Sequence, residues 1–170
     1  MNSNTLHSMP RGVVWAFLIL VAFFVFFPTY GNPKSSSIRT ACLSNVKQMV
    51  LGNLQYATGY DDALPIADHW MNSLSLVESR VGDSTHDWER VFHDPTLFAS
   101  GKYGYAFRRE ASALRLDKVD KPETYGLIFD SVFTQRNAVG GLSSLPQPGR
   151  HNGRNSVGHL DGHVKSIAMP

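Results

Sequence analysis

A run of 15 consecutive apolar side chains, Val13–Phe27, constrains the fold of this chain more than any other feature of its sequence. In a helix these side chains would cover every side, and no polar stripe would remain to face water, as one does on the helices of soluble domains. As a helix, residues 12–30 would extend over roughly 28 Å, close to the thickness of the hydrocarbon core of a bilayer. We therefore predict a transmembrane helix over residues 13–30.

Three kinds of membrane segment fit this run: an uncleaved single-pass anchor, a secretory signal peptide that is removed, and a pilin-type leader whose helix is retained. Removal of a signal peptide requires small residues at the cleavage site, and residues 28–31 (PTYG) approximate such a site only weakly. The bulky Phe26 and Phe27 favour retention. We expect the lipid bilayer to be a partner of the chain through Val13–Phe27.

The charge of the chain is unevenly distributed. Its first 60 residues contain four basic residues and no acidic one, while the net charge of the whole chain is only +2. The basic character therefore belongs to the N-terminal arm and does not indicate a nucleic-acid partner. Cys42 is the only cysteine, which excludes an intrachain disulfide and a metal site made of several cysteines. No cofactor is predicted.

Residues 38–170 are expected to form one small domain, after an N-terminal segment (1–12), the transmembrane helix (13–30) and a linker (31–37). Apolar residues then recur three or four positions apart, which predicts an amphipathic helix over residues 38–58. Its apolar stripe consists of Ile38, Cys42, Val46, Met49, Val50, Leu54 and Ala57. Stripes of this kind usually pack on their own domain, and we expect the same here.

Shorter segments follow, bounded by turn residues. Residues 69–77 and 87–92 are expected to be short helices, whereas 103–107 (YGYAF) and 125–129 (YGLIF) are rich in aromatic and branched residues and predict strands. The Gly- and Pro-rich stretch 134–154 is typical of a long irregular loop. Asp161-Gly162 lies between two short segments with apolar residues, which predicts a β-hairpin with a type I′ turn. Helices followed by strands indicate the α+β class, with a small antiparallel sheet that ends in this hairpin.

Several landmarks occur in the same order as in a known bacterial family. Residues 42–48 (CLSNVKQ) precede Tyr56 and 61–65 (DDALP); 122–124 (PET) precede 129–131 (FDS); and His151 is separated by nine residues from Asp161-Gly162, which 163–165 (HVK) follow. In these features residues 39–167 resemble the prepilin-type proteins with an H-x9-DG domain, a family similar to type IV pilins and type II secretion pseudopilins.

The resemblance implies a pilin-like α+β domain outside the cytoplasm, carried by a single-pass helix in the inner membrane, and assembly with other pilin-like subunits. It also implies leader processing at Arg11 and Gly12. The chain departs from the pilin pattern at Phe17, where such leaders have a Glu that can pair with the amino terminus of a neighbouring subunit. Polymerisation therefore stays open. The basic residues that flank the apolar run would by themselves place the domain in the cytoplasm, and we give the resemblance precedence over them.

His151, Asp161 and Gly162 are the residues of the H-x9-DG motif. If residues 155–160 are extended, His151 and Asp161 lie roughly 17 to 20 Å apart. We therefore predict separate roles, in which Asp161-Gly162 forms the turn and His151 fixes the long loop to the domain through a backbone hydrogen bond.

The residue types of this region fit two kinds of site, a zinc site and a hydrolase triad, but the sequence does not complete the requirements of either. His151, His159, Asp161 and His163 are candidate zinc ligands, but a structural zinc site needs four ligands that converge. Ser131, His151 and Asp161 have the residue types of a hydrolase triad, but no G-x-S-x-G motif surrounds Ser131. We therefore predict neither a metal site nor a catalytic site.

The predicted function is that of a membrane-anchored, pilin-like or pseudopilin-like structural or interaction subunit, in an assembly of the type II secretion or type IV pilus kind. The alternative is a single-pass membrane protein whose extracytoplasmic domain binds a ligand or a metal and does not polymerise. Neither function is that of an enzyme.

Overall fold

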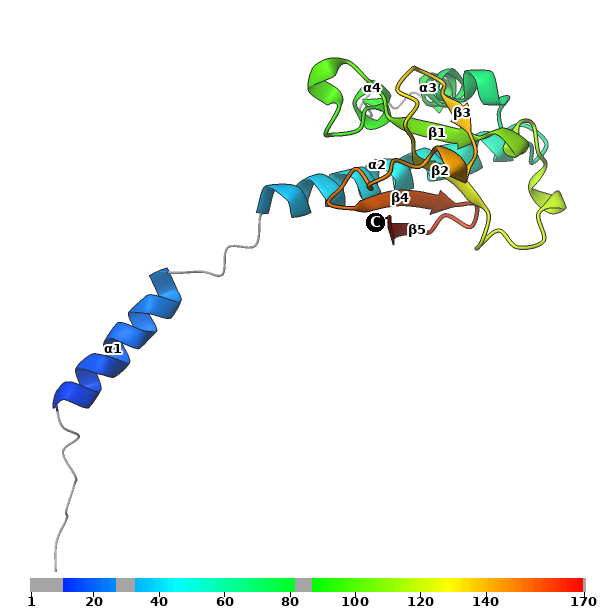
Figure 1. The fold of residues 1–170 in the computed structure, drawn as a ribbon. Helices are drawn as coiled ribbons and strands as arrows, with labels where there is room; N and C mark the ends of the chain where they lie inside the picture. Colours follow the sequence, from blue (N-terminus) through cyan, green and yellow to red (C-terminus); the bar gives the residue numbers. More distant parts are fainter. Residues whose placement is uncertain (1–10, 27–32, 82–86, 170) are drawn as a thin grey trace, which may run out of the picture. The chain divides into compact units, whose positions relative to one another are not determined.

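A computed structural model of the chain describes residues 11–26, 33–81 and 87–169. The chain divides into two compact units, Met1–Pro33 and Lys34–Pro170. We call the second unit the head. It combines helices with a five-stranded sheet, which is the α+β class expected from the sequence (Figure 1).

Helix α1, Arg11–Phe26, contains most of the apolar run and begins with the two residues of the expected processing site. It has 16 residues, whereas a membrane-spanning helix needs about 20. Within the described ranges, no helix is both long enough and apolar enough to cross a membrane. The prediction of a transmembrane helix over residues 13–30 was therefore wrong. Residues 27–30 of that prediction lie outside the described residues.

Helix α2, Pro33–Thr58, begins inside the stretch expected to be a linker. Proline has no backbone N–H and a fixed φ near the helical value, so at the first helical position it favours a helix start. The structure confirms the predicted apolar stripe, because five of its members are fully buried. They are Cys42, Val46, Met49, Val50 and Ala57.

The sheet has the strand order β3-β1-β2-β4-β5. Its strands are β1 (Tyr105–Arg108), β2 (Gly126–Asp130), β3 (Val139–Gly140), β4 (Arg154–His159) and β5 (Val164–Ala168). Neighbouring strands are antiparallel, except that β1 and β3 run parallel. Strands were expected at β1, β2 and the final hairpin, whereas β3 lies in the stretch expected to be an irregular loop.

Helix α2 approaches the sheet closely at Gly158 of β4. A Cβ atom at Gly158 would lie 2.5 Å from Val50 Cγ2 and 2.7 Å from Val46 Cγ1. Only a residue without a side chain therefore allows the stripe of α2 to pack directly on β4. In Figure 1, α2 runs beside β2 and β4.

Two further helices complete the core. Helix α3, Trp70–Val81, follows a 3₁₀ turn over Ala67–His69, and helix α4 comprises Trp88–Phe92. The Trp70 ring packs on Phe92 and Phe107 at centroid distances of 5.8 and 5.9 Å, and its Nε1 donates to the Ala138 carbonyl. This packing fixes the end of α4, and with it the Asp94-Pro95 segment, against the interior of the head.

The β4–β5 hairpin has a different turn from the one expected. His159 N–H donates to His163 O, and Gly162 N–H donates to His159 O, so the loop has three residues. Only Gly162 among these three has a positive φ, of 92°, and Asp161 does not. The type I′ prediction was therefore wrong, and the geometry corresponds to the three-residue hairpin with a positive-φ residue at its end.

The contact at Gly158 gives a prediction for stability. We expect Gly158→Ala to lower the free energy of unfolding by about 1–3 kcal/mol, because the added methyl group overpacks the contact with Val46 and Val50. Gly141→Ala is the matched control, since its nearest neighbour would be 3.8 Å away and its φ is −113°. Urea denaturation of the full chain measures both. Equal effects of the two substitutions would contradict the close packing of α2 on β4.

Candidate functional site

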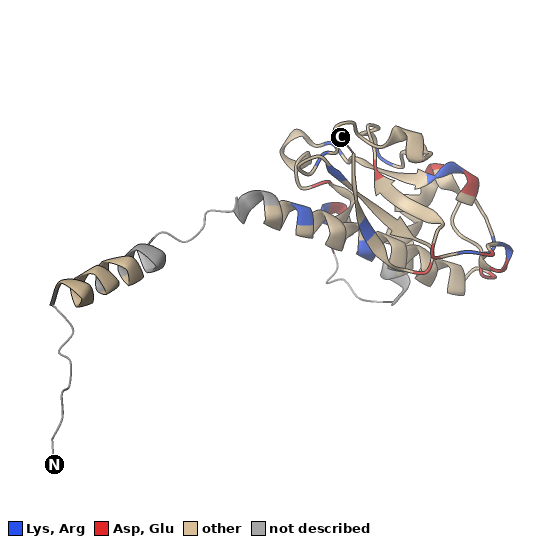
Figure 2. Ribbon diagram, turned by 60° about the horizontal axis from the view of Figure 1, so that its bottom comes forward, with Lys and Arg blue, Asp and Glu red and all other residues tan. Residues whose placement is uncertain are grey.

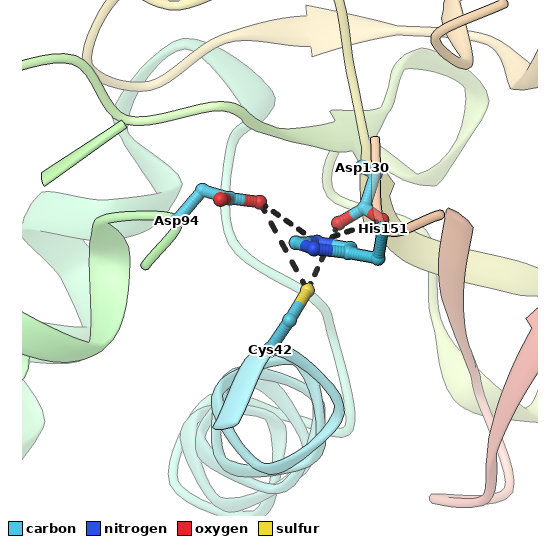
Figure 3. Close-up of side chains that lie close together, drawn as sticks. All are labelled: Cys42, Asp94, Asp130 and His151. Atoms are coloured by element: carbon cyan, nitrogen blue, oxygen red, sulfur yellow. Dashed lines mark hydrogen bonds and ion pairs between the residues drawn. The ribbon is translucent and has the colours of Figure 1, made fainter. Parts of the chain in front are cut away.

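Four side chains with metal-binding or acid–base chemistry meet inside the head (Figure 3). They are Cys42, Asp94, Asp130 and His151, and we call them the buried cluster. One ligand atom from each residue can be chosen so that the four atoms all lie within 4.8 Å of one another.

Each member of the buried cluster comes from a different segment. Cys42 lies on the buried stripe of α2, Asp94 follows α4, and Asp130 is the last residue of β2. His151 lies in the turn that precedes β4. Because β2 and β4 are antiparallel neighbours, the end of β2 and the beginning of β4 lie at the same end of the sheet.

The His151 ring lies between the two carboxylates. Its Nε2 is 3.1 Å from Asp94 Oδ2 and 3.6 Å from Asp130 Oδ2. The Cys42 sulfur is 3.2 Å from Asp130 Oδ1 and 4.0 Å from Asp94 Oδ2. Within the described residues, His151 Nδ1 is buried and has no hydrogen-bond partner. The orientation of the ring is therefore held by the contacts of Nε2 in the cluster.

Neighbouring groups hold the carboxylates in place. Thr96 donates both its backbone N–H and its hydroxyl to Asp94 Oδ1, which leaves Oδ2 directed toward His151. Arg150 Nη1 lies 3.3 Å from the same Oδ2. On the other side, the backbone N–H of Ser156 donates to Asp130 Oδ2 at 2.6 Å.

The buried cluster is closed to solvent. Cys42, Asp94 and Asp130 have no exposed surface, and His151 is 5% exposed. Burial raises the pKa of the Cys42 thiol well above its usual range, and the two neighbouring carboxylates raise it further. Burial also raises the pKa of Asp130 to about 6, although the His151 charge and the Ser156 hydrogen bond oppose this shift.

The other two members form an ion pair. Burial disfavours the charged form of each, but their mutual contact outweighs it. The hydrogen bonds from His151 and Thr96 lower the pKa of Asp94, and the hydrogen bond to Asp94 with the charges of both aspartates raises the pKa of His151. These shifts favour the ionised form of Asp94, the protonated form of His151 and the thiol form of Cys42.

This arrangement restricts the chemistry that the cluster can perform. A thiol is nucleophilic only as the thiolate, and burial here stabilises the protonated form. The four residues present almost no surface to solvent in this structure. Their donor atoms are one sulfur, one imidazole nitrogen and carboxylate oxygens, which are the types of ligand that zinc takes in proteins.

The structure gives the H-x9-DG residues the separate positions expected of them, with one different partner. The backbone N–H of His151 donates to the Arg154 carbonyl, whereas its ring contacts the carboxylate of Asp94, a partner that was not predicted. Asp161 accepts hydrogen bonds from the backbone N–H and ring of His163 within the hairpin turn. The ring of His159 stacks on that of His163 at a centroid distance of 4.2 Å.

The candidate zinc ligands and the candidate triad are not assembled. His151 is the only one of the four candidate zinc ligands that belongs to the buried cluster. The other candidates were His159, Asp161 and His163. Ser131 Oγ bonds the Ser144 hydroxyl and accepts from the Phe133 N–H, while His151 and Asp161 have the partners given above.

Sequence reasoning missed three members of the buried cluster. Cys42 was assigned to the apolar stripe, which is correct but incomplete, and the sequence offered no signal for Asp94. The clearest available signal was Asp130, a charged residue that directly follows the apolar residues of β2. A carboxylate at the end of a buried strand needs a buried partner, and this requirement points to His151.

Comparison with known proteins adds no relative: no family model, no curated protein and no solved structure matches the chain.

The raised pKa of His151 predicts a pH-dependent contribution to stability. The contribution is complete below the pKa of an unfolded histidine, about 6.5, and is lost as pH rises through the higher folded pKa. We expect His151→Gln to cost about 3 kcal/mol at pH 5.5, because it breaks a buried ion pair, and clearly less at pH 9. Urea denaturation in the presence of a chelator, which removes any contribution of bound metal, measures this difference.

His69→Gln is the matched control, since His69 is exposed. We expect its effect to be small at both pH values. A cost of His151→Gln that is constant or increases toward pH 9 would contradict the ion pair with Asp94.

Proposed function

We propose that this chain is a non-catalytic structural or interaction subunit of the pilin-like kind. In this proposal the head is a rigid body, and helix α1 joins the chain to other copies. The observation that carries it is the burial of the cluster: the four residues best suited for chemistry have between 0 and 5% of their surface exposed. They connect segments of the head and are not presented to a substrate.

The contacts of the H-x9-DG motif support a structural role. At one end of the motif, His151 belongs to the buried cluster together with Cys42 of α2. At the other end, the carbonyl of Gly162 accepts a hydrogen bond from Lys47 Nζ of the same helix. A Cβ atom at Gly162 would also contact Leu51 and Leu54 of α2 at 3.6 and 3.9 Å. The two ends of the motif therefore hold α2 against the sheet at two points along its length.

This pairing gives a physical reason for the resemblance described above. Cys42 and Lys47 both lie in the CLSNVKQ segment, and His151 and Gly162 are the two ends of the second motif. The nine intervening residues include β4, which carries the chain from one point of contact on α2 to the other. The distance between Cys42 and Lys47 along α2 must then match the distance between His151 and Gly162 along β4. Such a match is expected of residues that hold a helix on a sheet and not of a reactive site.

Helix α1 supplies the surface for assembly. Trp15, Phe17, Ile19 and Leu20 are between 57 and 67% exposed, and Val13, Val14 and Val21 are exposed as well. After Arg11, helix α1 contains no charged residue, whereas the head carries both signs (Figure 2). An uncharged apolar surface of this kind marks a site of association. The pilin-like resemblance implies other pilin-like subunits as the partners, and we propose that copies of this chain are among them.

The test compares purified full chain with Ile19→Asp by analytical ultracentrifugation and electron microscopy. Ile19 is 67% exposed on α1 and is not the position at which pilin leaders carry an acidic residue. We expect the unaltered chain to form assemblies of defined size and Ile19→Asp to reduce the assembled fraction by at least about tenfold, because a charge would be buried among apolar helices. Phe98→Asp is the matched control, since Phe98 is 56% exposed on the head, and it should leave assembly unchanged.

Three results would contradict the proposal: a monomeric unaltered chain, assemblies without defined size, or equal loss of assembly in both variants. A monomer that binds lipid vesicles through α1 would instead identify lipid as the partner of this helix.

A further inference from the structure

We propose that the buried cluster is a structural zinc site, in which Cys42, Asp94, Asp130 and His151 supply the four ligands. This inference rests on the geometry of the head and is independent of the assembly proposed for α1.

The distances between donor atoms fit a tetrahedral ion. Zinc bonds of about 2.0–2.3 Å place neighbouring ligand atoms of a tetrahedron about 3.3–3.8 Å apart. Asp94 Oδ2 lies 3.1 Å from His151 Nε2 and 4.0 Å from Cys42 Sγ, and Cys42 Sγ lies 3.2 Å from Asp130 Oδ1. One ligand atom from each of the four residues lies within 4.8 Å of the others, so shifts of about 1 Å or less bring the four groups to tetrahedral positions.

The donor set favours zinc over other common cations. Calcium takes six to eight oxygen ligands, and magnesium requires an octahedron of oxygens, whereas this cluster offers sulfur and nitrogen beside two carboxylates. A set of four protein ligands also fills the tetrahedron, which is typical of structural zinc sites and not of catalytic ones.

The charges around the cluster suit a divalent cation. Zinc binding would release the thiol proton of Cys42 and the proton of His151, because ligands bind the metal in their deprotonated forms. The ion with one thiolate, two carboxylates and a neutral imidazole has a net charge of −1. The guanidinium of Arg150, 3.3 Å from Asp94 Oδ2, balances this charge.

Contacts outside the cluster already orient the ligands. Thr96 occupies Asp94 Oδ1 and leaves Oδ2 for the ion, and Ser156 N–H occupies Asp130 Oδ2 and leaves Oδ1 beside the Cys42 sulfur. Such outer hydrogen bonds are a regular feature of metal sites and set the direction of the ligand lone pairs. The Ser156 hydroxyl, 3.2 Å from the Cys42 sulfur, is a further donor to a thiolate.

The test measures metal in the purified full chain. After dialysis against a weak chelator, we expect one zinc ion per chain, measured by inductively coupled plasma mass spectrometry. His151→Gln and Cys42→Ser should each weaken zinc binding by at least about 100-fold, since changes to outer hydrogen bonds alone cost 10- to 100-fold. The double variant Asp161→Asn with His163→Gln is the matched control, because it removes a partly exposed Asp–His pair outside the cluster and should keep the zinc.

A second measurement replaces zinc by cobalt in the unaltered chain, so that it does not depend on whether a variant folds. Cobalt bound to the unaltered chain should show an intense tetrahedral visible spectrum and a thiolate-to-cobalt charge-transfer band, which Cys42 alone can supply. A folded chain without stoichiometric zinc, a cobalt complex without the thiolate band, or zinc lost from the control but kept by His151→Gln would each overturn the proposal. Affinity that rises with pH would support it, because the ligands must lose protons.

Discussion

Two opposite charges, on Asp94 and His151, are held in the interior of the head, where water does not reach them. Burying an ion pair is favourable only if both partners are also hydrogen-bonded with good geometry. Asp94 meets this condition, because Thr96 bonds one of its oxygens and Arg150 approaches the other. His151 is bonded through Nε2 alone, since its Nδ1 has no partner within the described residues. Asp94 and His151 lie on separate segments. The segment after α4 and the turn before β4 are thereby fixed relative to each other, because moving either would leave a buried charge unpaired. Asp130 adds the end of β2 to the same arrangement.

Apolar packing and polar contacts act differently on helix α2. The apolar stripe provides attraction to the sheet, but burial of apolar surface is non-directional and by itself permits several positions of a helix along its axis. Gly158 allows the helix to approach the sheet closely. The contacts of Cys42 with the cluster and of Lys47 with Gly162 then select one axial position and one rotation, because hydrogen bonds require a particular geometry. The stripe thus favours docking, and the motif residues determine where the helix docks.

The local parts of this architecture could be predicted from the sequence, because their signals come from nearby residues. The period of the apolar stripe identified the buried face of α2, and aromatic and branched residues identified β1 and β2. The buried cluster has no such signal: Cys42 and Asp130 are 88 positions apart, and only the folded sheet brings them together. The transmembrane prediction over residues 13–30 depended on apolar composition alone, whereas α1 has 16 residues and no helix in the described ranges is long and apolar enough to cross a membrane. The turn type failed because Asp-Gly fits both a two-residue and a three-residue hairpin loop.

The distribution of the cluster along the chain has a consequence for synthesis. Its members occur at positions 42, 94, 130 and 151, so a chain emerging from the ribosome exposes the apolar face of α2 long before His151 and β4 exist to cover it. Contacts between residues so far apart in sequence also make folding slow relative to that of helical bundles. During this interval the uncovered stripe is a target for chaperones and for aggregation. Until His151 and β4 are made, Asp94 lacks its imidazole partner and the apolar face of α2 lacks the strand that covers it.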